Sequence, residues 1–166
     1  MTAADIAVLP VYRAAVEASW IDYNGHLRDA YYGVVFSDAI DAVMDHLGLH
    51  AEYRERTRCT LYTLEQHTHF LHEVKHTDAL QVTSSILDAD GKRIHLGGRF
   101  DVDRRDAGLI TVATSEVMLL HVRQGDNPAT AAFPEAIAAT IQALKLSPGE
   151  STAWGPRSRA LELKRR

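Results

Sequence analysis

The chain has 166 residues, of which 46% are hydrophobic and 24% charged, as in an ordinary folded domain that buries a core of its own. Its net charge of -4 gives no reason to expect nucleic acid or an anionic membrane as a partner. Its apolar runs are too short to span a bilayer. Because Cys59 is the single cysteine, an internal disulfide is excluded, which fits a reducing cytoplasm. Polar residues throughout 1–20 predict no signal peptide.

The first part of the chain predicts one strand and one long helix. Residues 8–21 are rich in apolar and β-branched side chains, which favours a strand. Residues 30–47 repeat apolar side chains at helical spacing, with acidic side chains on the opposite face. We expect Asp29 to be the N-cap of this helix and Gly48 to follow its C-cap.

The middle of the chain predicts a short helix and then a run of strands. Residues 49–56 favour the helix, and residues 79–88 favour a strand that ends at Asp90-Gly91, a pair typical of hairpins. Residues 60–74 predict one long strand before it. On one face of that long strand we expect Tyr62, Leu64, Gln66, Thr68 and Phe70.

The return strand of the hairpin, 94–102, is interrupted by Gly97-Gly98, which predicts a bulge or a close approach by another group. After a turn at 103–108, residues 109–122 predict the last long strand. An apolar stripe over 134–146 predicts a terminal helix, and from Ser147 we expect a mobile tail.

This order of elements predicts an α+β fold, because the strands run consecutively and do not alternate with helices. The long helix must bury its apolar stripe, so we expect an antiparallel sheet wrapped around it. We interpret 1–146 as a single domain and 147–166 as the tail, with no internal repeat and no linker.

The segment Asp22-Tyr23-Asn24-Gly25-His26-Leu27, followed by Tyr32, Phe36 and an apolar helix, resembles the start of the hotdog-fold acyl-CoA thioesterases of the 4-hydroxybenzoyl-CoA thioesterase type. Residues 76–102 resemble the strand–hairpin–strand of that family, and 112–122 resemble its final strand. The resemblance covers about residues 8–123. Within the family the chain is most similar to thioesterases linked to carnitine breakdown, for which betainyl-CoA is the proposed substrate.

The resemblance implies roles for the residues around the start of the helix. Asp22 would attack the thioester carbonyl or activate a water that does, and the backbone amides of Asp29 and Ala30 would hold the developing oxyanion. Gly25 would permit the turn between them. His26 would orient Asp22, bind substrate or line the turn. The chain differs from many relatives at Arg28-Asp29, where those have two asparagines, so a negative charge lies beside the expected oxyanion site.

Each of these residues also has a simpler interpretation. An aspartate beside Asn24-Gly25 is often only a turn residue that binds local backbone amides. Glu65 alternates with His67 and His69 along the predicted strand, so the three share a face. That face is either the solvated side of the sheet or the place where Glu65 meets the helix start of a neighbouring subunit as a second catalytic carboxylate. The histidines of 67–72 lack companion ligands, so we expect no metal.

Aromatic residues near the motif are candidates for substrate contacts. Trp20, Tyr23 and Tyr32, together with Asn24, lie in or near the expected site, and aromatic faces attract quaternary ammonium groups such as a betainyl group. The alternative is that these rings belong to the core or to a subunit interface.

The sequence therefore predicts a cytoplasmic acyl-CoA thioesterase that needs no cofactor, since coenzyme A is part of the substrate. We expect a homo-oligomer, a dimer or a tetramer, because an open sheet leaves an edge strand and one face to cover. A hotdog enoyl-CoA hydratase is one alternative, although its acid and histidine are five residues apart, whereas Asp22 and His26 are four apart. A non-catalytic acyl-CoA-binding module is the other.

Overall fold

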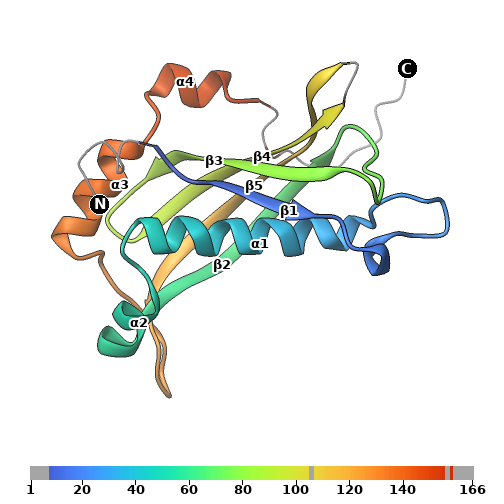
Figure 1. The fold of residues 1–166 in the computed structure, drawn as a ribbon. Helices are drawn as coiled ribbons and strands as arrows, with labels where there is room; N and C mark the ends of the chain where they lie inside the picture. Colours follow the sequence, from blue (N-terminus) through green and yellow to red (C-terminus); the bar gives the residue numbers. More distant parts are fainter. Residues whose placement is uncertain (1–7, 105–106, 156–157, 159–166) are drawn as a thin grey trace, which may run out of the picture.

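The structure is a computed structural model, and it describes residues 8–104, 107–155 and 158. Figure 1 shows a sheet of long strands with one long helix on one side and short helices at its periphery. In chain order the elements are β1 (Val11–Ala15), the 3₁₀ turn η1 (Ala18–Trp20), α1 (Asp29–His46), α2 (Ala51–Thr57), β2 (Cys59–Phe70), β3 (Ala79–Ala89), β4 (Arg93–Arg104), β5 (Gly108–Arg123), β6 (Ala129–Thr130), α3 (Glu135–Leu144) and α4 (Pro148–Ala153).

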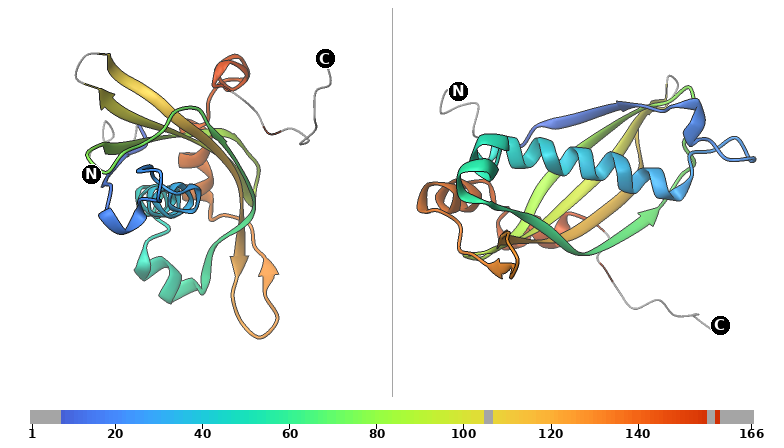
Figure 2. Two further views of the ribbon diagram at one scale, coloured as in Figure 1. Left: turned by 90° about the vertical axis from the view of Figure 1, so that its right-hand side faces the viewer. Right: turned by 90° about the horizontal axis from the view of Figure 1, so that it is seen from below.

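The strands form one antiparallel sheet in the order β1-β3-β4-β5-β2, with the short β6 paired to β5. The sheet curls around α1, as the end-on view in Figure 2 shows. The expected α+β architecture, an antiparallel sheet wrapped around a long central helix, is thus confirmed. In this order β2 has a strand partner on one side only, so it is an edge of the sheet.

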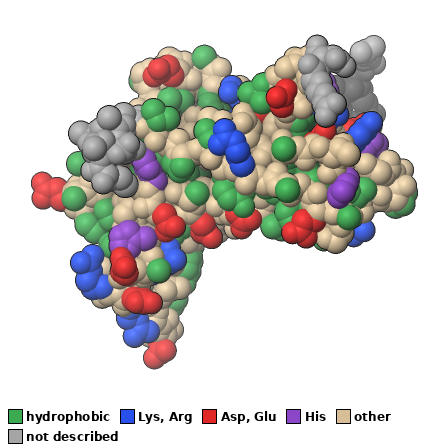
Figure 3. Space-filling view, in the orientation of Figure 1, with side chains coloured by type: hydrophobic (Ala, Val, Ile, Leu, Met, Phe, Trp, Pro, Cys, Tyr) green, Lys and Arg blue, Asp and Glu red, His purple; other side chains and the backbone are tan. Residues whose placement is uncertain are grey.

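Helix α1 is amphipathic and ends in a Schellman motif. Its buried face consists of Tyr32, Val35, Phe36, Ala39, Ile40, Val43 and Met44. At its C-terminus Gly48 has φ +83° and its amide donates to the carbonyl of Asp45, while the Leu49 amide donates to Met44. Gly48 therefore follows the C-cap as predicted, because this conformation favours glycine. Acidic side chains lie along the exposed side of the molecule below the sheet (Figure 3), and Asp41 of α1 is one of the exposed residues.

The N-cap prediction was wrong by one residue. Arg28 is the N-cap, with an extended backbone and no side-chain cap, and Asp29 is the first helical residue. The reason is that the carbonyl of Arg28 already accepts the Tyr31 amide over 3.1 Å, so the first turn of the helix includes Asp29 and Arg28 takes the cap position.

The Gly97-Gly98 pair marks two close approaches on opposite faces of β4. A Cβ built on Gly98 would lie 2.2 Å from Cε2 of the buried Phe36, which is part of α1. A Cβ on Gly97 would lie 2.5 Å from Cζ2 of Trp154, which follows α4. The predicted close approach is confirmed. Helix α4 therefore lies on the convex face of the sheet, opposite α1 (Figure 2).

Several strand predictions differ from the structure, and the strand expected over 60–74 ends at Phe70. The strand expected over 8–21 is limited to β1, because its partner β3 begins at Ala79, opposite Ala15. The shared face expected on β2 is interrupted by a bulge at Leu64, between Thr63 and Glu65. Because a bulge shifts the alternation by one residue, Tyr62 faces the convex side with Leu120, away from Gln66.

The tail expected over 147–166 begins with a helix, which corrects that part of the prediction, while 156–157 and 159–166 lie outside the described residues. Ser147 and Glu150 form a capping box at the start of α4, and the Ser151 hydroxyl donates to the carbonyl of Leu87 over 2.8 Å. The hydrogen bond of Ser151 fixes α4 to β3. Within the part of the chain that the structure describes, no helix combines the length and apolar character needed to cross a membrane.

Candidate active site

The motif around Asp22 forms a closed loop directly before α1. Ile21 and Leu27 pair across its base as an isolated antiparallel bridge, and the Asp22 amide donates to the carbonyl of His26 over 2.8 Å. Inside the loop the Gly25 amide donates to the carbonyl of Asp22, and Gly25 has φ +81°. Glycine is needed here because other residues are strained in that conformation.

The carboxylate of Asp22 is bound by the amides of its own loop. Its Oδ1 accepts the backbone N–H of Asn24 over 2.8 Å and that of His26 over 3.1 Å. These hydrogen bonds, that of His26 foremost, hold the pKa of Asp22 below its ordinary value. Asp22 is therefore both a turn residue and a carboxylate that is ionised at neutral pH, so its two interpretations are compatible.

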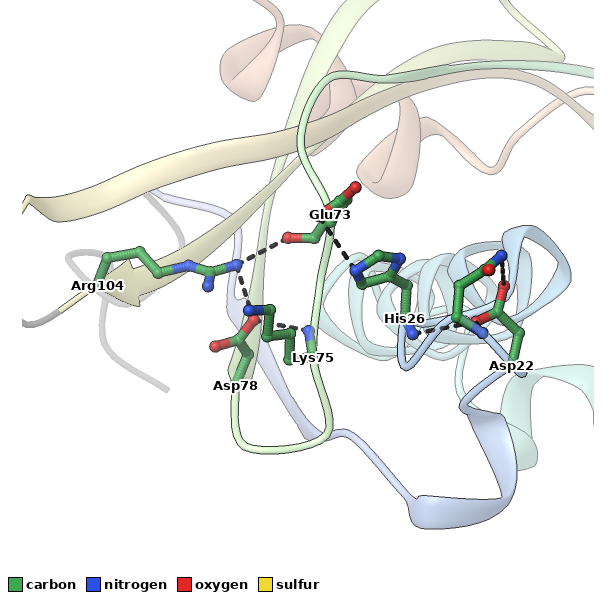
Figure 4. A network of polar contacts seen from close by, with 7 residues as sticks. Asp22, His26, Glu73, Lys75, Asp78 and Arg104 are labelled. Atoms are coloured by element: carbon green, nitrogen blue, oxygen red, sulfur yellow. Dashed lines mark hydrogen bonds and ion pairs between the residues drawn. The ribbon is translucent and has the colours of Figure 1, made fainter.

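The ring of His26 points away from Asp22, as Figure 4 shows. Its Nε2 lies 3.1 Å from Oε2 of Glu73, in the segment between β2 and β3. Of the three roles considered for His26, orienting Asp22 falls to its backbone amide and not to its imidazole.

Arg104, at the end of β4, fixes the same segment (Figure 4). Its Nη2 donates to the carbonyl of Glu73 over 2.7 Å and lies 2.8 Å from Oδ2 of Asp78. The Lys75 amide also donates to Asp78, and the Leu27 amide donates to the carbonyl of Val74. The start of α1 and the 71–78 segment are thereby held together.

We expect Arg104→Gln to lower the free energy of unfolding by about 1–3 kcal/mol, because it removes hydrogen bonds from a charged donor to the mostly buried carboxylate of Asp78. Urea unfolding monitored by circular dichroism measures this loss. The matched control is Arg99→Gln. Arg99 is half-exposed and 3.3 Å from Asp101, which also accepts the hydroxyl of Thr111 over 2.6 Å. Equal losses of unfolding free energy in the two variants would show that Arg104 stabilises the fold no more than the half-exposed Arg99 does.

A pocket of about 290 Å³ opens beside the start of α1. One wall comes from His26, Leu27, Asp29 and Tyr32, and the other from residues 70–73, which begin at the last residue of β2. Among the residues that the structure describes, none accepts the Asp29 amide. The Ala30 amide was expected to be free as well, but it donates to Oδ1 of Asp29 over 2.9 Å. The expected pair of oxyanion donors is therefore reduced to one.

Tyr32 lines this pocket and is otherwise buried. Its ring centroid lies 5.1 Å from that of Phe70, edge to face, and 5.8 Å from that of Phe100. Burial raises the pKa of Tyr32 to about 12, so its hydroxyl remains protonated near neutral pH. Tyr32 thus serves as both a core residue and a pocket residue.

The other aromatic candidates lie around the loop and outside this pocket's lining. Trp20 stacks on Tyr31 with ring centroids 5.2 Å apart. Tyr23 is 97% exposed, and the exposed Asn24 turns its side-chain amide toward Asp22, 3.4 Å away. Within one chain these residues are neighbours of the pocket but do not line it.

Glu65 is not brought to the Asp22 loop within one chain. It pairs with Met118 on the convex face of the sheet and lines a separate cavity of about 500 Å³ with His95 and Glu116. His67 and His69 share this face, with ring centroids 4.6 Å apart. In the described part of the chain, no group of three or more potential ligands is arranged to hold a metal ion.

Sequence reasoning missed Glu73 and Phe70 as site residues. Phe70 was expected only as part of a strand face, and Glu73 carried no signal because its partner His26 is far away in the sequence. An exposed apolar pair, Phe70-Leu71, at the end of a long strand is the one local hint of a surface pocket.

Comparisons with known proteins agree with this geometry. Residues 16–141 match the model of the thioesterase-like superfamily, and the chain belongs to that family, a class of thioester hydrolases. A betainyl-CoA thioesterase of Pseudomonas aeruginosa is 43% identical over 137 residues, which cover 82% of this chain and 84% of that protein.

Solved structures support the same fold. A Staphylococcus aureus protein in complex with CoA superposes with a TM-score of 0.76 at 30% identity, covering 92% of this chain and 94% of the other. A 4-hydroxybenzoyl-CoA thioesterase superposes with a TM-score of 0.74 at 10% identity, covering 80% and 97%. The fold is therefore the hotdog fold, as the motif resemblance implied.

Proposed function

We propose that this protein hydrolyses betainyl-CoA to betaine and coenzyme A in the cytoplasm, with the thioester carbonyl between the Asp22 loop and the start of α1. The acyl group would lie in the adjoining pocket, whose lining includes His26 and Asp29 but not Asp22. The observation that carries the proposal is the ionised Asp22 loop placed directly before a helix start with an open amide. The 43% identity to a betainyl-CoA thioesterase supports the choice of substrate.

The reaction needs an attacking group and a site for the developing oxyanion. In one route a water molecule gives a proton to Asp22 while its oxygen bonds to the carbonyl carbon. In the other, an oxygen of Asp22 bonds to that carbon, and water then hydrolyses the resulting anhydride. In both routes the C–S bond breaks, and the CoA thiolate leaves and takes up a proton. The lowered pKa of Asp22 keeps it in the ionised form that either route requires.

The Asp29 amide, at the positive end of the α1 dipole, is the proposed oxyanion donor. The side chain of His26, held toward Glu73, lines the pocket. Neither route uses a metal or a redox cofactor.

We further propose that the working form is a homo-oligomer in which two copies pair along β2. This edge strand and the residue after it expose Tyr62, Leu64, Phe70 and Leu71, each by 38–55%. A long exposed apolar edge is a template for pairing with another strand. Such a partner would add residues to the open side of the pocket and would bring Glu65 of a neighbouring copy closer to it.

The test is release of free thiol from a panel of acyl-CoA thioesters that includes betainyl-CoA, acetyl-CoA and 4-hydroxybenzoyl-CoA. We expect betainyl-CoA to give the highest kcat/KM. Preference for another thioester would refute betainyl-CoA as the substrate, but the protein would still be a thioesterase. Absence of turnover on every thioester would refute hydrolysis, and the enoyl-CoA hydratase and binding-module alternatives would then be assayed.

A further inference from the structure

The pocket at the start of α1 has a distinctive chemistry. Two of its lining residues, Asp29 and Glu73, carry carboxylates, two others, Tyr32 and Phe70, carry aromatic rings, and none is a lysine or an arginine. Arg104 approaches Glu73 only at its backbone carbonyl. The side-chain charge that faces this pocket is therefore negative, apart from any proton held by its two histidines.

The position of Asp29 is unfavourable for hydrolysis of a neutral acyl group. Its carboxylate belongs to the first residue of α1, next to the amide that we assign to the oxyanion. Negative charges on the Asp29 carboxylate and on a neighbouring oxyanion repel each other. The side chain does not act as an N-cap, since its Oδ1 accepts only the following amide, that of Ala30.

A permanent cation on the acyl group would offset this electrostatic repulsion. In a betainyl thioester the quaternary nitrogen is separated from the reacting carbonyl carbon by one methylene, so both must lie at the same end of the pocket. The Asp29 carboxylate would then face both the oxyanion and the cation. Its attraction to the cation offsets its repulsion of the oxyanion. Aromatic rings add attraction for a quaternary ammonium group. Phe70 is 55% exposed and offers the more open ring.

We propose that Asp29 is the specificity residue of this pocket and selects acyl groups with a quaternary ammonium next to the carbonyl. The rings of Phe70 and Tyr32 provide the apolar walls for its methyl groups, and Glu73 contributes a second negative charge. This inference rests on the proposed thioesterase function, from which it takes the position of the acyl group.

A pair of isosteric substrates tests the proposal directly. Betainyl-CoA and 3,3-dimethylbutyryl-CoA have the same shape. They differ in one atom, which is a cationic nitrogen in betainyl-CoA and a neutral carbon in the other. We expect Asp29→Asn to lower the ratio of their kcat/KM values by about tenfold, mainly through poorer use of betainyl-CoA. Asparagine keeps an oxygen for the Ala30 amide, so the helix start is preserved. Asp41→Asn is the control, because it removes the same charge from the exposed side of α1 and should leave the ratio unchanged.

A binding measurement separates this inference from the proposed function. The thioether analogues with a methylene in place of the carbonyl, 2-(trimethylammonio)ethyl-CoA and 3,3-dimethylbutyl-CoA, are not hydrolysed, and calorimetry gives their Kd values. We expect the wild type to bind the cationic analogue more tightly than the neutral one. If this preference falls about tenfold in Asp29→Asn, the inference is supported even if no thioester is turned over. An unchanged ratio in both assays would overturn it, even if betainyl-CoA is hydrolysed well.

Discussion

Replacement of Asp22 by asparagine is expected to lower kcat for thioester hydrolysis by about 10²–10⁴-fold, the usual contribution of a group that moves a proton in the transition state. Asparagine keeps the side-chain oxygen that accepts the amides of Asn24 and His26, and it favours the same kind of turn. The variant therefore removes the charge and basicity of residue 22 and leaves its loop in place. Thiol release under steady-state conditions measures the effect, and circular dichroism confirms the fold.

Two further variants make this result specific. Asp41→Asn removes a carboxylate from the exposed side of α1 and is expected to keep wild-type kcat. Glu65→Gln tests the other candidate carboxylate, which faces the convex side of the sheet. Full activity of Asp22→Asn together with loss of activity in Glu65→Gln would assign the chemistry to Glu65 and refute the proposed role of Asp22.

The second large effect is expected on stability. Gly98→Ala should lower the free energy of unfolding by about 1–3 kcal/mol, because the added methyl group would overlap the ring of Phe36 in a close-packed core. Phe36 is fully buried and its ring lies 5.7 Å from that of Phe100, so it has little room to move. The shift in the urea midpoint at constant m-value measures the loss.

Gly97→Ala is the matched control, since it adds the same methyl group one residue away on the other face. Its neighbour Trp154 lies at the partly exposed end of α4, where the indole can shift, so we expect a smaller loss. A Phe36→Leu substitution should recover part of the stability of Gly98→Ala and reveal coupling between the two positions. Equal losses in the two glycine variants, or no recovery, would show that Phe36 is not the limiting contact.

The features that the sequence predicted well have causes within a few neighbouring residues. The apolar stripe of α1, the glycine after its C-cap and the Asp22 turn depend on short-range spacing and backbone preferences. The capping box of α4 is equally local, and Ser147-Pro148 followed by Glu150 is a readable signal. The basic residues that follow it favour a tail instead, so the two local signals conflict.

The features that could not be predicted depend on contacts between distant segments. The pairing of His26 with Glu73 requires the β2–β3 connection to pass the start of α1, and no local pattern encodes that path. The same is true of the bulge at Leu64, which depends on how β2 pairs with β5.

The placement of α4 restricts how larger assemblies can grow. Two sheets that stack face to face approach to about 10 Å, and over β3 and β4 that space is already occupied by α4 and Trp154. A second sheet could stack there only after this helix had left. Within the described residues, the edge at β2 carries no such obstruction. A second copy can therefore add a strand at this edge, whereas α4 prevents a second sheet from stacking over β3 and β4.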